Sequence, residues 1–359
     1  MELLDGKYQI EQLLGQGGMG AVYRATHIGT RRTVAVKVIR PELSTHNEFV
    51  ARFRREAEAA GRLRHPNVVD VTDFGVTQTS RGPVAYLVME YLDGRTLAEI
   101  IAEEGALPIH WVIDILDQVC SAVDEAHRAG IIHRDLKPDN IWLEPNRRGG
   151  YTVKVLDFGL VKLADAHAAP PETAREQFNE HPTLLRPDTE EQATLFKPAH
   201  RSPVERISSN GRKAQLQSHP HAESQHENLT VVGSVMGTPF YMSPEQCRGE
   251  NLDERSDIYS LGVIAYRLLT GETPFKGTVE ELINLHKTAE PPPIREKNPK
   301  VSRKMARILM SALQKDPAKR PQTAGGFASA LRESWEGPGH LLQHAFAFYS
   351  EYFPTFLKI

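Results

Sequence analysis

Two polar stretches, each beside an apolar run, constrain this chain more than any other feature. The first has the sequence HRDLKPDN at residues 133–140; the second, DFG at 157–159, follows a strand-like apolar segment. Together they supply the carboxylates of Asp135 and Asp157, the ammonium group of Lys137 and the amide of Asn140. Phosphoryl transfer from Mg-ATP needs such a set: a base near the acceptor hydroxyl, oxygen ligands for Mg²⁺ and a cation beside the moving phosphoryl group. A two-carboxylate hydrolase is the rival use of an acid pair, but it does not need the accompanying lysines and glycines.

A glycine-rich segment near the N-terminus favours the same chemistry. Strand-like residues 8–14 lead into GQGGMG at residues 15–20, and Val22 and Tyr23 resume the strand pattern. A GxGxxG run also opens dinucleotide-binding folds, where a helix follows the glycines, and it occurs in plain flexible hairpins. Here β-branched and aromatic residues follow, so a strand-to-strand turn is predicted. Glycines let such a turn approach phosphates without obstruction by Cβ atoms.

These motifs, with VAVK at residues 34–37, resemble the catalytic domain of eukaryotic-like (bacterial, Hanks-type) Ser/Thr protein kinases. The resemblance covers roughly residues 8–333, apart from one internal block. It implies an α+β, bilobal kinase fold, with a β-rich N-lobe that contains one key helix (1–90) and an α-helical C-lobe (91–335). Within the N-lobe we expect the helix near 47–63, a strand starting at 65–69 and another at 86–89.

The resemblance also implies roles for the loop residues. Asp135 accepts or orients the proton of the attacking hydroxyl, and Lys137 screens charge on the transferred group. Asn140 and Asp157 hold Mg²⁺, for which Mn²⁺ could substitute.

Farther along the chain, three more segments match the family: YMSPE at 241–245, SDIYSLG at 256–262 and KDPAKRP at 315–321. By resemblance, Asp257 anchors the backbone of the catalytic loop, and Arg320 pairs with Glu245.

Lys37 ends a short apolar strand, where a lysine is expensive without a partner. By resemblance it holds the α- and β-phosphates, and Glu56 fixes it; the alternative is that Glu56 belongs to a solvated, charged helix with local pairs. The resemblance places Met89 behind the nucleotide pocket and the backbones of Glu90 and Leu92 along the adenine edge. The full set expected around ATP is Leu14, Gly15, Gln16, Gly17, Gly18, Met19, Gly20, Val22, Ala35, Lys37, Met89, Glu90, Leu92 and Trp142.

Trp142 departs from the family pattern, which has a smaller aliphatic residue under the adenine. Its ring either faces the nucleotide, which adds stacking area and takes up room, or packs sideways into the large lobe.

Composition limits the compartment and the kinds of partner that we expect for this chain. The chain has 359 residues, a formal net charge of −3 and only two cysteines, Cys120 and Cys247. We therefore expect a protein of a reducing, cytoplasmic compartment, with no disulfide scaffold and no nucleic acid partner. Cys120 is expected in the core, whereas Cys247 could be exposed. The chain shows no signal peptide and no apolar run long enough to span a membrane.

The block from 166 to 229 interrupts the resemblance. It is rich in Pro, His, Glu, Gln and Ser and poor in aromatics, so we expect a mostly disordered insertion in the activation segment. A docking or phosphorylation-controlled tether is one interpretation, and a tolerated surface insertion is the other. Its six histidines have irregular spacing and no accompanying Cys, which argues against a zinc site. Just after it, Thr230, and less so Ser234, is the expected autophosphorylation site that pairs with Arg134, and Thr238 is expected to shape the acceptor site.

The tail at 336–359 is apolar and aromatic. We expect a helix packed on the large lobe, with an interfacial membrane segment or dimer contact as the alternative. The expected partners are protein substrates that carry Ser or Thr, and a second copy of the chain for trans-autophosphorylation. Alternatives to an active kinase are a pseudokinase-like nucleotide-binding scaffold and, with less support, a small-molecule kinase.

Overall fold

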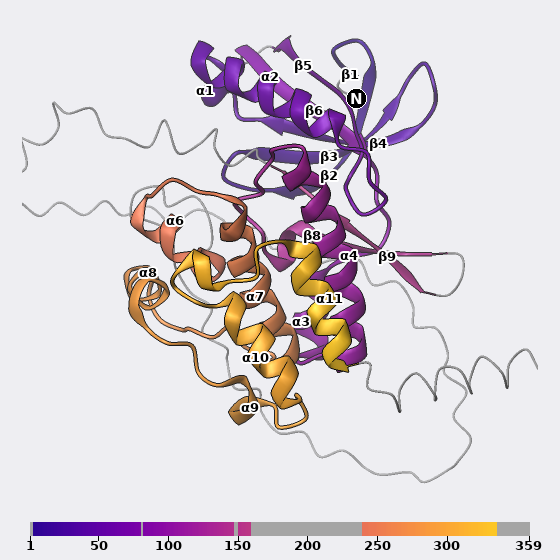
Figure 1. The fold of residues 1–359 in the computed structure, drawn as a ribbon. Coiled ribbons are helices and arrows are strands. Elements are labelled where there is room, and N and C mark those ends of the chain that lie inside the picture. Colours follow the sequence, from indigo (N-terminus) through magenta and orange to yellow (C-terminus); the bar gives the residue numbers. More distant parts are fainter. Residues whose placement is uncertain (1–2, 80–81, 147–149, 159–238, 336–359) are drawn as a thin grey trace, which may run out of the picture. The chain divides into compact units, whose positions relative to one another are not determined.

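The computed structural model describes residues 3–79, 82–146, 150–158 and 239–335. Its N-terminal part is one antiparallel sheet of six strands in the order β1-β2-β3-β4-β6-β5 (Figure 1). These strands contain many β-branched and aromatic residues, which fit the pleated, half-buried surface of a sheet. The strands are β1 (Leu3–Leu4), β2 (Tyr8–Gln16), β3 (Gly20–His27), β4 (Thr33–Ile39), β5 (Val71–Thr79) and β6 (Gly82–Glu90).

One long helix, α2 (Asn47–Arg62), covers this sheet, after the single turn of α1 (Pro41–Ser44). Its buried side chains, Phe49, Phe53, Ala57 and Ala60, recur at three- to four-residue spacing and form one apolar face. They pack with residues of β4, β5 and β6 in a single cluster. The helix expected near 47–63 is therefore confirmed.

Residues 65–69, which were expected to begin a strand, are not part of one in the structure. The strand β5 starts only at Val71, because residues before it bond to the C-terminal part of the chain instead. Asn67 O accepts from Val155 N at 2.8 Å, and Val69 N donates to Val155 O at 3.1 Å. This isolated bridge joins the two parts of the chain beside the candidate site.

The C-terminal part is helical, with a small sheet in the order β7-β8-β9. The helix α4 lies against α7 and α11 (Figure 1), and their apolar residues share one large core. Nearly every residue of α7 from Ser256 to Leu269 is buried, as suits a central helix. The strands are β7 (Arg95–Thr96), β8 (Ile141–Pro145) and β9 (Tyr151–Val155). The helices are α3 (Leu97–Glu104), α4 (Ile109–Arg128), α6 (Pro244–Arg248), α7 (Glu254–Thr270), α8 (Val279–Thr288), α9 (Ile294–Lys297), α10 (Arg303–Ala312) and α11 (Ala324–Trp335), with short 3₁₀ turns η1 (Pro138–Asn140), η3 (Pro239–Tyr241) and η4 (Pro317–Lys319).

The two cysteines are both unpaired thiols. Cys120 is fully buried in α4, as expected, and Cys247 in α6 is half-buried rather than exposed. Burial raises the pKa of the Cys247 thiol to about 11 and that of Cys120 further. Separately, none of the described helices combines the length and the apolar character that a membrane crossing requires.

Candidate active site

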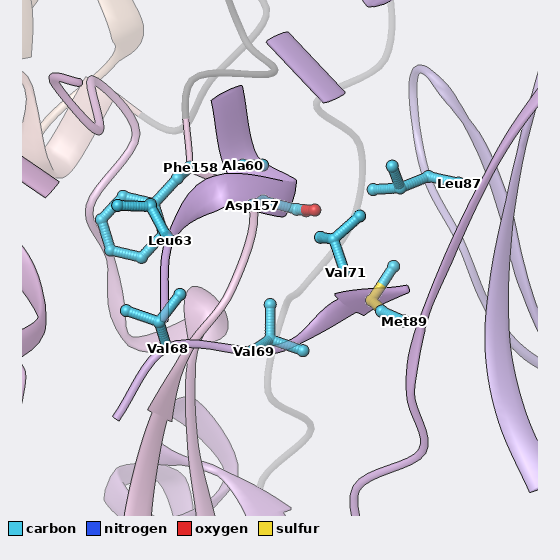
Figure 2. A pocket seen from close by; sticks show the side chains of 9 residues that line it. All are labelled: Ala60, Leu63, Val68, Val69, Val71, Leu87, Met89, Asp157 and Phe158. Carbon is cyan, nitrogen blue, oxygen red and sulfur yellow. The ribbon is translucent and has the colours of Figure 1, made fainter. Parts of the chain in front are cut away.

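Asp157 directly follows the β9 region, and its backbone is left-handed, with φ of 58°. This conformation is uncommon for a residue with a side chain, and such residues concentrate at functional sites. The next residue, Phe158, is buried and packs on the ring of His133, with 4.8 Å between ring centroids. Asp157 also lines a small cavity (Figure 2) whose walls are Ala60, Leu63, Val68, Val69, Val71, Leu87, Met89, Asp157 and Phe158.

The Lys37 ammonium donates to Asp157 Oδ2 at 2.7 Å, which links β4 to the segment after β9. Burial by itself would raise the pKa of Asp157. The charge and hydrogen bond of Lys37, with smaller contributions from His133 and Lys137, outweigh that effect and hold the pKa below its usual value. Asp157 is therefore a carboxylate at neutral pH. Glu56 lies on α2 as expected, but the ion pair that the structure shows for Lys37 is with Asp157, so the Lys37–Glu56 pair stays a prediction.

The backbone of the catalytic loop is fixed by Asp257 on α7. Its two carboxylate oxygens accept the N–H groups of His133 at 2.8 Å and Arg134 at 2.9 Å, and His127 Nε2 lies 2.8 Å from Oδ2. Asp257 is 1% exposed, and burial works against its charge. The hydrogen bond and charge of His127, with smaller contributions from His133, offset that penalty and hold the pKa of Asp257 below its usual value. The predicted anchoring of the loop by Asp257 is confirmed.

Within the loop, three polar side chains converge. Lys137 Nζ donates to Asp135 Oδ2 at 2.6 Å. The Asn140 amide nitrogen donates to the Asp135 carbonyl at 2.8 Å and to Asp135 Oδ2 at 3.2 Å. Since these bonds use the amide nitrogen, the amide oxygen is the Asn140 atom that could coordinate a cation. The sequence-predicted set of Asp135, Lys137 and Asn140 is thus brought together in one cluster.

Gln246, on the first turn of α6, touches this loop and was not singled out from the sequence. Its Oε1 accepts from Ser243 N at 2.8 Å, as part of a capping box, and its Nε2 donates to the Arg134 carbonyl at 2.6 Å. The Ser-Pro-Glu-Gln pattern signals the cap, but no local signal indicates the contact with a residue 112 positions away.

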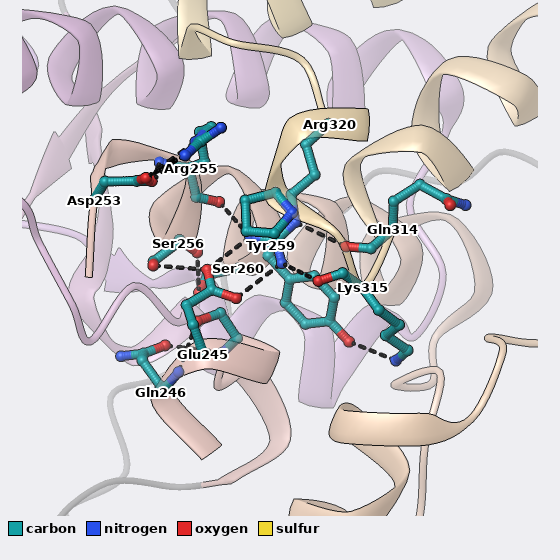
Figure 3. A network of polar contacts seen from close by, with 12 residues as sticks. Glu245, Gln246, Asp253, Arg255, Ser256, Tyr259, Ser260, Gln314, Lys315 and Arg320 are labelled. Carbon is teal, nitrogen blue, oxygen red and sulfur yellow. Dashed lines mark hydrogen bonds and ion pairs between the residues drawn. The ribbon is translucent and has the colours of Figure 1, made fainter. Parts of the chain in front are cut away.

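Beside Gln246, Glu245 and Arg320 form a buried, two-pronged ion pair (Figure 3). The two N–O distances are 2.7 and 2.8 Å, and the side chains are 5% and 0% exposed. Burial would raise the pKa of Glu245, but the Arg320 guanidinium and the Ser256 hydroxyl at 2.7 Å lower it below its usual value. The Glu245–Arg320 pair expected from the sequence is confirmed.

The glycine-rich turn is a strand-to-strand connection between β2 and β3, as predicted. A Cβ atom on Gly20 would stand 2.0 Å from the Val38 carbonyl oxygen, so only glycine fits there. Gly17 N donates to Gly20 O at 2.8 Å, and Arg40 bonds the Gly17 carbonyl at 3.1 Å. Residues 15–18 are exposed, while Met19 and Gly20 are half-buried.

Several other residues expected around ATP lie in the N-terminal sheet or directly after it. Ala35 on β4 is the register partner of Met89 on β6. Both are buried in the cluster that α2 forms with β4, β5 and β6, and Val22 and Leu92 pack against that cluster. The Glu90 backbone nitrogen donates to the Asp70 carbonyl at 3.0 Å. Leu14 is 44% exposed, so its position as a cover for the nucleotide stays a prediction.

Trp142 is half-buried on β8, and its indole N–H donates to the Asp93 carbonyl at 2.7 Å. The ring therefore leaves the large-lobe core, where its strand neighbours Ile141 and Leu143 are buried. Thr230, Ser234, Thr238, the block 166–229 and the tail 336–359 lie outside the described residues.

The side chains gathered at this site suit the binding of Mg²⁺ and of the phosphates of ATP, which the motifs imply. An amide oxygen on Asn140 and a carboxylate on Asp157 are hard ligands of the kind Mg²⁺ takes, and Lys37 and Lys137 supply positive charge for phosphates. Across the part of the chain that the structure describes, there is no group of three or more His, Cys, Asp or Glu residues arranged to hold a metal alone. Substrate phosphates usually complete such a Mg²⁺ site.

Comparison with known proteins defines the class. A profile of the protein kinase domain matches residues 8–180 and 214–335, so this chain belongs to the protein kinase family. The fold agrees: the kinase domain of PknI from Mycobacterium tuberculosis superposes with a TM-score of 0.61, at 24% identity, over 92% of this chain and 98% of that one. The bilobal, α+β kinase fold expected from the sequence is confirmed.

The similar curated proteins are serine/threonine-protein kinases. Pkn3 of Myxococcus xanthus is 39% identical over 329 residues, which is 91% of this chain and 49% of that protein. PknB of Mycobacterium leprae is 34% identical over 330 residues, 91% of this chain and 43% of that protein. The chain thus spans about half the length of the curated relatives it matches, and the match to the eukaryotic-like Ser/Thr branch is confirmed.

Proposed function

We propose that this chain is an active Ser/Thr protein kinase that transfers the γ-phosphoryl group of ATP to protein hydroxyls and autophosphorylates its activation segment. The observation that carries the proposal is the cluster of Asp135, Lys137 and Asn140 beside a loop that holds the Lys37–Asp157 ion pair. The motifs of the family supply the roles, and the short distances between these side chains support them.

In this reaction Asp135 orients the acceptor hydroxyl and takes its proton as the O–P bond forms and the bond to ADP breaks. Lys137, 2.6 Å from Asp135, neutralises charge on the transferred group. Lys37 holds the α- and β-phosphates, with Glu56 as its further support. Asn140 and Asp157 would hold Mg²⁺, or Mn²⁺ in its place, which offsets the charge of the β- and γ-phosphates when bound.

Residues 14–20, Val22 and Ala35 are proposed to enclose the nucleotide from above, with Met89, Glu90 and Leu92 along the adenine and Trp142 beneath.

The proposed division is an N-lobe at 1–90, a C-lobe at 91–335 with an insertion at 166–229, and a tail at 336–359. Thr230 and Ser234 are the proposed autophosphorylation sites, with Thr238 in the acceptor site. We also propose a cytoplasmic location, no nucleic acid or membrane partner, and transient pairing of two copies during autophosphorylation.

The test is transfer of labelled γ-phosphate from Mg-ATP to the chain itself and to a generic basic protein. Asp135→Asn keeps the shape of the side chain but removes the base, and we expect a loss of about 10²- to 10⁴-fold in kcat. Mapping of the modified sites then tests Thr230 and Ser234. Binding of ATP without transfer in the wild type would instead favour the nucleotide-binding scaffold.

A further inference from the structure

The segment 90–93 connects β6 to β7 and runs along the small sheet. We propose that Trp142 on β8 and Lys154 on β9 hold the two ends of this segment, and so set the selectivity of the site for an adenine over a guanine nucleotide. Lys154 is a positioning residue that acts through the Glu90 carboxylate, and Trp142, proposed above to lie beneath the adenine, also positions the segment through the Asp93 carbonyl. The inference rests on the proposed function, because it concerns how that site reads its nucleotide.

Strand geometry places the two side chains on one face. Successive residues of a strand point to opposite faces, and directly paired residues on neighbouring strands point to the same face. Ile141 and Leu143 are buried in the large core at 0% and 6% exposure, so Trp142 leaves the opposite face of β8. Its register partner on β9 is Lys154, which therefore leaves the same face.

Each of the two side chains bonds one end of the segment. The Trp142 indole N–H donates to the Asp93 carbonyl at 2.7 Å, and Lys154 Nζ donates to Glu90 Oε1 at 2.7 Å. The same Glu90 oxygen accepts the N–H of Asp70 at 2.9 Å, which fixes the carboxylate from a second side. The Lys154 side chain is 13% exposed, so this ion pair is shielded from water more than a surface pair.

The next residue, Gly94, shows how closely the segment lies on β8. A Cβ atom there would stand 2.2 Å from the Leu143 carbonyl oxygen and 2.9 Å from Pro145 Cδ, and its φ is 106°. No other residue fits this approach. Arg95 and Thr96 of β7 pair with Leu143 and Trp142 of β8. Together with the close approach at Gly94, this pairing brings the Asp93 carbonyl within reach of the Trp142 indole.

The consequence concerns the backbone groups of Glu90 and Leu92, which are proposed to bond the adenine edge. Adenine presents a donor and then an acceptor along this edge, and guanine presents the reverse order. A backbone held at both ends cannot turn a peptide to suit the reversed pattern, so guanine leaves polar groups unpaired. A backbone released at one end loses part of its preorganisation for ATP and part of its discrimination.

Two variants test this in the full chain. Trp142→Phe removes the indole N–H and keeps an aromatic ring, and Lys154→Met removes the charge and keeps the aliphatic stem. Trp111→Phe, at a side chain that is 42% exposed on α4, and Lys276→Met, in an exposed ion pair, are matched controls. The measurements are kcat and KM for ATP and for GTP at saturating protein substrate.

For each test variant we expect the KM for ATP to rise about 3- to 10-fold, the range of one hydrogen bond. Lys154 is outside the proposed nucleotide contacts, so Lys154→Met should also keep kcat within about 2-fold of wild type. We expect the ratio of kcat/KM for ATP over GTP to fall by at least about 3-fold, on the same scale. The controls should keep wild-type values. A purely structural role would lower the melting temperature without moving the nucleotide preference, and that result would overturn the inference.

Calorimetric binding of ADP and GDP gives a readout that does not need catalysis. If the wild type binds ADP but transfers no phosphate, the proposed function fails, while a lower ADP-over-GDP preference in Trp142→Phe still supports this inference. If the wild type is active and both variants keep its nucleotide preference, the inference fails alone. Should one variant not fold, the other decides.

Discussion

At the scale of single residues, Arg134 shows how the chain holds a strained backbone. Its φ is 68°, a conformation that residues with a side chain rarely adopt. Asp257 accepts its N–H and Gln246 donates to its carbonyl, so side chains from α7 and α6 fix both backbone polar groups of this residue. The next residue is Asp135. The position of the proposed base therefore depends on two side chains that do not touch substrate.

Gln246→Glu tests this arrangement with almost no change in shape. The carboxylate offers no donor to the Arg134 carbonyl, so a bond of 2.6 Å becomes a repulsive contact between oxygens. We expect kcat to fall about 10-fold or more and the free energy of unfolding to fall by about 1–3 kcal/mol, the penalty of a lost, partly buried hydrogen bond. Gln78→Glu, on an exposed part of β5, is the matched control and should leave both values unchanged. Wild-type kcat in Gln246→Glu would contradict this account.

His286 gives a prediction for pH. It is fully buried on α8, its Nδ1 lies 2.9 Å from the Tyr259 hydroxyl, and the Lys315 ammonium donates to the same hydroxyl at 3.3 Å. Burial, and then the charge of Lys315, lowers the pKa of His286 to about 4. Between pH 4 and 6.5 the unfolded chain binds a proton that the native chain does not, so stability falls as the pH decreases through this window.

The expected loss from this group is up to about 3 kcal/mol, at 1.36 kcal/mol per pKa unit. Urea titrations at several pH values between 4 and 7 measure it. His286→Asn should flatten the dependence above pH 5, where the carboxylates with lowered pKa contribute little. An equally steep dependence in that variant would assign the effect to other groups.

At the scale of elements, the Glu245–Arg320 pair joins α6 to the segment between η4 and α11. Glu245→Gln leaves the guanidinium buried without its counter-charge, and removal of one partner from such a pair typically reduces the free energy of unfolding by about 3–5 kcal/mol. Glu103→Gln makes the same change in the exposed pair with Arg95, where we expect less than about 1 kcal/mol. Chemical denaturation of both variants compares them directly; similar losses would mean that Glu245 is not desolvated as the structure indicates.

The sequence could predict features that depend on neighbouring residues, but not contacts between segments that lie far apart along the chain. Contiguous motifs identified the loops that carry Asp135, Lys137, Asn140 and Asp157, and the sequence predicted a helix near 47–63, because these signals are local. The partner of Lys37 depends on how far α2 stands from β4, which no local pattern encodes. The orientation of Trp142 is set by a carbonyl 49 positions earlier, and the segment 65–69 is drawn from β5 by a bridge to Val155. These long-range choices required the structure.

For the molecule as a whole, nucleotide binding should appear as stability. A ligand that binds only the native state stabilises it by RT ln(1 + [L]/Kd), about 2.7 kcal/mol at 100 times its Kd. We expect Mg-ADP to raise the melting temperature accordingly and chelation by EDTA to remove most of that rise. Asp157→Asn, which loses a carboxylate ligand for Mg²⁺, should respond weakly to Mg-ADP and little to EDTA. A metal-independent rise in the wild type would place Asn140 and Asp157 outside any metal site.

The raised pKa values of the two thiols have a practical consequence for the whole molecule. The thiolate is the form that reacts with maleimides and disulfide reagents, and its share at neutral pH is very small when the pKa of Cys247 is about 11 and that of Cys120 is raised further. A single cysteine placed at the exposed Gln78 would therefore accept a fluorophore or spin label selectively, without prior replacement of the native cysteines.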